Sequence, residues 1–102
     1  MKRDVFQAIA DPTRRAILVL IAAQAMTPNA LAEEVNMSRQ SVSKHIRVLN
    51  ECDLLEYDKQ GREIYYKLKI EKMGEVDQWL EQFRAIWEKR FSNLDDLLKN
   101  MK

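Results

Sequence analysis

Four polar side chains recur along one segment of the chain at a spacing that would bring them together. Gln40, Ser43, Lys44 and Arg47 fall at positions i, i+3, i+4 and i+7, which share one face of a helix. Lysine and arginine neutralise phosphates, and glutamine and arginine can form paired hydrogen bonds with base edges in the major groove of DNA. Serine hydroxyls can donate to phosphates at close range. The pattern favours a DNA-binding face, although a solvated helix face would show the same spacing.

The positive charge of this segment is local. Residues 38–50 contain three basic side chains and no acidic one, whereas the chain of 102 residues has a net charge of only +1. Whole-chain charge averages over unlike surfaces, so it gives no evidence for a nucleic-acid partner. The chain has 46% hydrophobic and 32% charged residues, with two glycines and two prolines. This composition predicts one soluble, helix-rich domain over residues 1–102.

A helix over residues 39–50 would position the donors. Ser38 is a favourable N-cap. Val42, Ile46 and Leu49 recur at i, i+4 and i+7, which predicts the buried side of this helix. The donors would then face outward because the helix is docked by its opposite side.

A shorter helix over residues 28–35 is predicted just before it. Thr27 fits the N-cap and Pro28 the first turn, and a tight break at residues 36–38 separates the two helices. This arrangement predicts a helix-turn-helix over residues 28–50. The N-terminal residues of its second helix usually do most of the base reading. Those residues are Gln40, Ser41, Ser43 and Lys44, and Arg47 would lie nearer the phosphate backbone.

Two helices are predicted at the start of the chain. Residues 4–10 have an amphipathic pattern, and Asp11 followed by Pro12 suits the start of a second helix. The stretch RRAILVLIAAQA also has features of a signal peptide, but its apolar run is short and acidic residues precede it, so a buried helix is favoured. Arg14 and Arg15 are expected to form a structural ion pair with a nearby acid, with a DNA contact as the alternative.

Residues 54–68 show the alternation of a β-hairpin. Apolar and polar residues alternate on both sides of Gln60-Gly61, and glycine accepts the positive φ that a tight turn requires. Such a hairpin could act as a wing that places Lys59 and Arg62 on the adjacent DNA backbone or minor groove. The alternative is a hairpin that only closes the core.

Residues 71–100 predict a long amphipathic helix whose apolar pattern extends to Met101. At 1.5 Å per residue it would run ~40 Å, too long for so small a domain to cover. Its apolar face is therefore expected to meet a second copy of the chain. Ser92 and Asp95 have the spacing of a capping box, which leaves open a kink or restart there. No stretch approaches the length of a transmembrane helix.

From about residue 4 to 69 the chain resembles the ArsR/SmtB family of winged-helix repressors. The segments ADPTRR-x-IL, SRQSVSKHIRVL and GREIYYKL occur in the order and spacing of that family. The resemblance implies a mainly α fold with a β-hairpin wing, dimerising through its first and last helices. It also implies a homodimeric bacterial repressor of transcription. Such a protein binds double-stranded DNA at inverted repeats and covers promoters. Ser38, Gln40, Ser41, Ser43, Lys44 and His45 match its DNA-reading helix.

Two sets of candidate site residues follow from the pattern and the resemblance together. The expected DNA-binding residues are Ser38, Arg39, Gln40, Ser41, Ser43, Lys44, His45, Arg47, Lys59 and Arg62. The expected dimer interface comprises Phe6, Met73, Val76, Trp79, Leu80, Phe83, Trp87, Phe91 and Leu94.

The sequence departs from the metal-sensing branches of the family. These carry paired cysteines near the start of the recognition unit, or Asp/His and His/Glu sets on the last helix. Residues 31–41 contain no cysteine, and residues 71–102 contain neither histidine nor cysteine. Zinc sites usually need three or four ligands. We therefore expect no metal and no cofactor.

Cys52 is the only cysteine, which excludes an intramolecular disulfide and suits a reducing cytoplasm. A small buried residue behind the recognition helix is the favoured interpretation. The alternatives are a redox-responsive repressor acting through Cys52 and a protein-interaction module that uses the winged scaffold without binding DNA. The pattern offers no catalytic site, and an inducer, small molecule or protein, is not identifiable.

Overall fold

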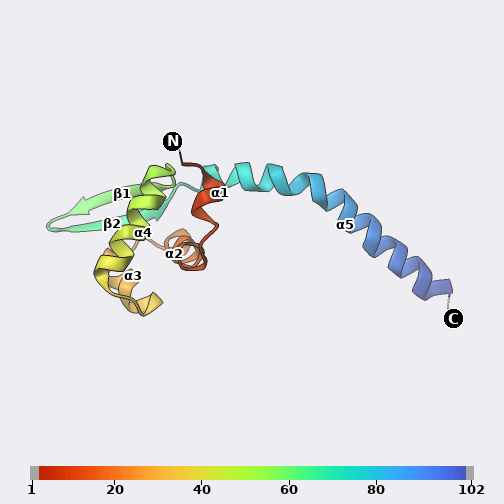
Figure 1. Ribbon diagram of the computed structural model, residues 1–102, viewed down its shortest axis with the longest axis horizontal. Helices are drawn as coiled ribbons and strands as arrows, with labels where there is room; N and C mark the ends of the chain where they lie inside the picture. Colours follow the sequence, from red (N-terminus) through yellow and green to blue (C-terminus); the bar gives the residue numbers. More distant parts are fainter. Residues whose placement is uncertain (1–2, 101–102) are drawn as a thin grey trace.

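The structure is a computed structural model that describes residues 3–100, which form a small helical body with two projections (Figure 1). Residues 1–2 and 101–102 lie outside the described part, including Met101 of the apolar pattern. The helices are α1 (Val5–Ala8), α2 (Pro12–Ala23), α3 (Pro28–Val35), α4 (Arg39–Glu51) and α5 (Gly74–Asn100). The strands are β1 (Leu55–Gln60) and β2 (Glu63–Leu68), and the short 3₁₀-helix η1 (Ile70–Met73) leads into α5. The predicted fold, mainly α with a β-hairpin wing, is confirmed.

Each of the first four helices begins at a side chain that accepts a hydrogen bond from a free backbone N–H. Such caps satisfy donors that a helix leaves unpaired in its first turn. The capping residues are Asp4, Asp11, Thr27 and Ser38, and they accept from the backbone N–H of Gln7, Arg14, Ala30 and Ser41. The three caps predicted from sequence, Asp11, Thr27 and Ser38, are therefore confirmed.

The turn between α3 and α4 depends on Asn36, which adopts a left-handed conformation with φ of 54°. The backbone N–H of Met37 donates to the carbonyl of Ala32 at 3.0 Å, and that of Asn36 donates to Glu33 at 3.3 Å. These two bonds form a Schellman motif, which ends a helix and redirects the chain within two residues. The turn brings α4 across the body immediately after α3 ends.

One hydrophobic core joins all the elements of the body. Its buried members are Val5, Ala8, Ile17, Leu18, Ile21, Met26, Leu31, Val42, Ile46, Leu49, Cys52, Leu54, Leu55 and Leu68. The three positions predicted to dock α4, namely Val42, Ile46 and Leu49, are all buried, so that prediction is confirmed.

The wing, β1 with β2, is an antiparallel hairpin anchored only at its base. Leu55 pairs with Leu68 next to the core, and both side chains are buried. Gln60 pairs with Glu63, so the two-residue loop is Gly61-Arg62 and not the predicted Gln60-Gly61. Gly61 has a φ of 65°, as the first loop position of a type II′ turn requires.

The base of the wing is held by a contact that the sequence did not predict. Met26, in the link between α2 and α3, exchanges two backbone hydrogen bonds with Tyr66, at 3.0 and 2.8 Å. This isolated bridge adds a third short segment beside β2. It fixes the wing relative to α3 and so relative to α4.

Helix α5 leaves the body on the side opposite the wing (Figure 1). It is one unbroken helix through Ser92, so the capping box considered there does not interrupt it. It begins at Gly74, three residues later than predicted, because residues 70–73 form η1. Its projection accounts for the elongated shape, 65 × 30 × 21 Å.

No helix within residues 3–100 is long and apolar enough to cross a membrane.

The Asp11 cap leads to a testable pH dependence. The backbone N–H of Arg14 donates to the Asp11 carboxylate at 2.9 Å, and this bond lowers the pKa of Asp11 below its ordinary value. The stabilisation from charged Asp11 is present at neutral pH and is lost as the pH falls through this lowered pKa. We expect Asp11→Asn to unfold at lower urea concentration than the wild type at pH 7, by about 0.3–1 kcal/mol. The difference should shrink as the pH falls through the lowered pKa of Asp11, and a gap that stays constant throughout the acid range would contradict the assignment.

Candidate nucleic-acid interface

The outward side of α4 carries a continuous row of hydrogen-bond donors. This row, called the donor face below, comprises Arg39, Gln40, Ser43, Lys44 and Arg47, all of them exposed. The buried side of the same helix packs into the core, so α4 cannot turn without exposing apolar surface. The predicted separation of the two sides of the helix is confirmed.

A groove runs between the donor face and the base of the wing. Arg39, Ser43 and Arg47 line it from α4, and Ile64 and Tyr66 line it from β2. Arg39 and Arg62 also line a smaller hollow at the start of α3. Guanidinium groups from α4 and from the wing therefore border one recess, although Glu63 contributes a carboxylate to its lining.

The wing carries its two predicted basic residues near its exposed end. Lys59 lies in β1 and Arg62 in the turn, and both are exposed. Beyond the Tyr57–Tyr66 pair, whose rings are 6.4 Å apart, the hairpin has no buried residue on β1. The core therefore ends before the tip of the wing, which leaves the tip free to contact a ligand.

Ser38 and Ser41 are engaged with each other at the start of α4. The Ser38 Oγ accepts the backbone N–H of Ser41 at 3.1 Å, and the two hydroxyl groups are 3.0 Å apart. Ser41 is also half-buried, unlike the residues of the donor face. These two serines stabilise the N-terminus of α4, so less of their hydrogen-bonding capacity is left for a ligand.

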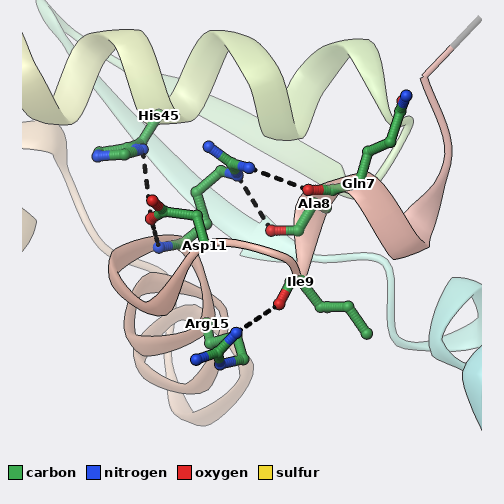
Figure 2. A network of polar contacts seen from close by, with 7 residues as sticks. Gln7, Ala8, Ile9, Asp11, Arg15 and His45 are labelled. Carbon is green, nitrogen blue, oxygen red and sulfur yellow. Dashed lines mark hydrogen bonds and ion pairs between the residues drawn. The ribbon is translucent and has the colours of Figure 1, made fainter.

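His45 does not share the donor face, although the resemblance placed it among the DNA-reading residues. Its Nδ1 lies 3.9 Å from the Asp11 Oδ2, and 19% of its side chain is exposed (Figure 2). It occupies the side of α4 that meets the start of α2. The structure therefore separates His45 from the other predicted DNA-binding residues.

Among the described residues, Arg14 and Arg15 do not form the ion pair expected of them. Within residues 3–100, neither pairs with a carboxylate; both donate to backbone carbonyl oxygens at the end of α1. Figure 2 shows the Arg15 contact with the carbonyl of Ile9. The predicted ion pair was wrong, because both guanidinium groups are taken up by the carbonyls at the end of α1.

Two exposed residues beside the donor face were missing from the predicted set. Asn50 lies three residues beyond Arg47 and lines the groove. Asn29, in the first turn of α3, lines the hollow that Arg39 and Arg62 share. The i+3 spacing could have identified Asn50, whereas Asn29 joins the surface only through the packing of α3 against α4.

A second surface, formed by α5 and α1, is apolar and exposed. Its members are Phe6, Trp79, Phe83, Ile86, Trp87, Phe91, Leu94, Leu97 and Leu98. The rings of Phe6 and Trp79 are 5.6 Å apart, and those of Trp79 and Phe83 are 5.0 Å apart. We call this set the aromatic face.

Two residues predicted for the dimer interface also contact the core of their own chain. Met73 and Val76 are partly buried and pack against the core of their own chain. They stand where α5 leaves the body, so their apolar surface is already covered in part. Leu80, the next residue of the predicted set, is half-buried at the border between the core and the aromatic face.

Cys52 is buried at the end of α4, with 6% of its surface exposed, as expected of a core residue. Burial raises the pKa of its thiol, which disfavours the reactive thiolate. Among the described residues, no three His, Cys, Asp or Glu side chains gather closely enough to hold a metal ion.

Comparisons with known proteins agree with this geometry. A family model described as "Helix-turn-helix domain" matches residues 9–58. The transcriptional repressor SdpR of Bacillus subtilis (strain 168) is 36% identical over 80 residues, which cover 78% of this chain and 89% of SdpR. This chain spans about half the length of several other curated regulators that it matches.

Two solved structures are similar. The ArsR-like transcriptional regulator from Rhodococcus sp. RHA1 has a TM-score of 0.71 and 32% identity, covering 96% of this chain and 90% of that one. The homodimeric winged helix-turn-helix DNA-binding domain of Mb0332 from Mycobacterium bovis has a TM-score of 0.61 and 22% identity, covering 83% and 76%. The second likeness concerns the fold alone.

The burial of Cys52 leads to a prediction about its reactivity. We expect iodoacetamide to alkylate Cys52 at least about tenfold more slowly in the folded protein than in urea, because the thiol is buried and its pKa is raised. Mass spectrometry of timed samples measures both rates. Rapid alkylation of the folded protein would instead support the redox-responsive alternative.

Proposed function

Because the chain belongs to the ArsR/SmtB family of winged helix-turn-helix repressors, we propose that it represses transcription as a homodimer bound to an inverted-repeat operator. Proteins of this family are DNA-binding transcriptional regulators and not enzymes. Repression would be steric, by covering promoter DNA. We further propose that the protein acts in the cytoplasm.

The observation that carries the proposal is the donor face of α4, which is exposed, free of acidic residues and adjacent to the wing. A major groove about 12 Å wide admits an α-helix presented in this way. Gln40, Ser43 and Lys44, in the N-terminal half of α4, are the proposed base readers. Arg47 and Arg39, together with Lys59 and Arg62 of the wing, are the proposed phosphate contacts.

The aromatic face supports the homodimer. Trp87, Phe91 and Leu94 are 49%, 68% and 51% exposed in the single chain. Exposed apolar surface of this extent usually marks an interface, and Mb0332 is described as homodimeric. Two copies related by a two-fold axis would present their α4 helices to successive major grooves, ~34 Å apart.

We propose that this repressor does not sense metal ions. The metal-sensing branches need ligand sets at positions that here hold neither cysteine nor histidine. Another molecule would then release the protein from DNA, or the protein would have no inducer.

Selection of the purified protein against random DNA duplexes tests the proposal. We expect enrichment of an inverted repeat whose half-site centres are one helical turn apart. If nothing is enriched at low salt, the donor face is only solvated, and the aromatic face should be tested as the surface of a protein-interaction module.

Substitutions on the donor face give a sharper prediction. We expect Lys44→Ala and Arg47→Ala each to weaken operator binding. Arg47→Ala, which removes a proposed phosphate contact, should also flatten the dependence of log K on log salt by roughly one unit. Fluorescence anisotropy at several salt concentrations measures both effects. Lys99→Ala, which removes one positive charge at the far end of α5, is the matched control. Unchanged affinity and slope in both donor-face variants would refute the assignment of this face.

A further inference from the structure

We propose that Arg14 and Arg15 are positioning residues that set the distance between the two recognition helices of the dimer. They would do so by holding α1, which carries part of the aromatic face, against the segment that contacts α4. This inference rests on the proposed homodimer on an inverted repeat. It assigns a role to the ADPTRR segment, which neither surface described above explains.

Both arginines bind the carbonyl end of α1. The Arg14 Nε donates to the carbonyl of Ala8 at 3.0 Å, and its Nη2 donates to that of Gln7 at 2.9 Å. The Arg15 Nη1 donates to the carbonyl of Ile9 at 2.7 Å. The last carbonyls of a helix have no acceptor role within it. The Gln7 carbonyl also accepts the backbone N–H of Ala10 at 3.3 Å, and the first turn of α2 supplies a side-chain donor to all three consecutive carbonyls.

Helix α1 needs these contacts to hold its place. It has only four residues, far fewer than a helix needs to be stable alone. A capping box between Asp4 and Gln7 secures its first turn. Val5 and Ala8 are buried in the core. The two arginines secure the remaining end, which leads directly into the cap of α2.

The outward side of α1 belongs to the aromatic face. Phe6 packs edge-on against Trp79 of α5 at 5.6 Å, and Trp79 continues the contact to Phe83. A shift of α1 would therefore shift the surface on which the partner subunit is proposed to pack. The position of α1 thus bears on how the two subunits are oriented.

The inward side of the same segment reaches the recognition helix. Asp11 accepts the backbone N–H of Arg14 at 2.9 Å, and its Oδ2 lies 3.9 Å from the Nδ1 of His45 in α4 (Figure 2). Arg3, just before α1, forms an ion pair of 2.6 Å with Glu51, the last residue of α4. The ADPTRR segment and its neighbours therefore join α4 to the aromatic face by contacts at both ends of α1.

The geometry requires arginine and not merely positive charge. One guanidinium of Arg14 serves two carbonyls through different nitrogen atoms, which its planar fork allows. A lysine ammonium is a single point with a flexible stem and cannot reproduce this arrangement. Substitution by lysine keeps the charge and removes the geometric constraint.

A small displacement of α1 would produce a larger displacement of α4 at the DNA. Half-sites ~34 Å apart place each recognition helix ~17 Å from the two-fold axis. A change of ~10° in the orientation of each subunit, about a pivot at the dimer contact with a lever arm of ~17 Å, would move α4 by ~3 Å, close to the ~3.4 Å rise of one base pair. Loosening α1 should therefore blur the spacing of half-sites that the dimer selects, without altering the donor face.

The test uses Arg14→Lys/Arg15→Lys and the inverted repeat recovered by selection. Duplexes with one base pair added to or removed from the centre, and a duplex with only one intact half-site, complete the set. We expect the double variant to bind the single half-site within about twofold of the wild type. We expect its preference for the correct spacing to fall at least about fivefold. Analytical ultracentrifugation and circular dichroism report the dimer and the fold.

Arg84→Lys is the matched control, because Arg84 pairs with Asp77 and Glu81 within α5 and does not touch α1. This variant should keep the spacing preference of the wild type. If the double variant unfolds, Arg15→Ala alone, which removes one exposed contact, is measured in the same series.

Three results would overturn the proposal: an unchanged spacing preference, a parallel loss of half-site affinity, or a folded variant that no longer dimerises. If the wild type itself selects no inverted repeat, the proposed function has failed first, and that outcome is distinct from all three.

Discussion

The docking of α4 by its apolar side is the constraint on which the rest of the structure depends. Val42, Ile46 and Leu49 are buried among residues of every other element of the body, so rotation of α4 would expose apolar surface. Burying three such side chains is worth about 1.5–3 kcal/mol each. The donor face needs no contact of its own to stay outward. Its chemistry is available to DNA because the core has fixed the opposite side.

The ends of α4 are fixed as firmly as its middle. Ser38 caps the start of the helix. At its end Asp53 has a φ of 59°, and the backbone N–H groups of Asp53 and Leu54 donate to the carbonyls of Asn50 and Leu49, respectively. The Asp53 carboxylate then accepts Lys69 Nζ at 2.6 Å, next to η1. The helix that carries the donor face is thus tied to the segment that leads into α5, as well as to α2.

The aromatic face shows the opposite situation, in which apolar residues have nothing to pack against. None of the residues of α5 is fully buried in the single chain, although the helix has a clear apolar side. Salt bridges of Arg84 with Asp77 and Glu81 lie within the helix and do not cover that side. A helix of this kind gains most of its stability when a second surface covers it.

The sequence by itself determined the features that depend on residues close together in the chain. Caps at Asp11, Thr27 and Ser38, the two sides of α4 and the alternation of the wing all arise from contacts or periodicities within a few residues. Only the tertiary structure decided which partners distant residues meet. Packing turned His45 toward Asp11, brought Arg14 and Arg15 to the end of α1, and joined Met26 to Tyr66. It also drew Met73 and Val76 onto the core. Local spacing cannot predict such contacts, because the free energy that selects them comes from burying the whole core at once.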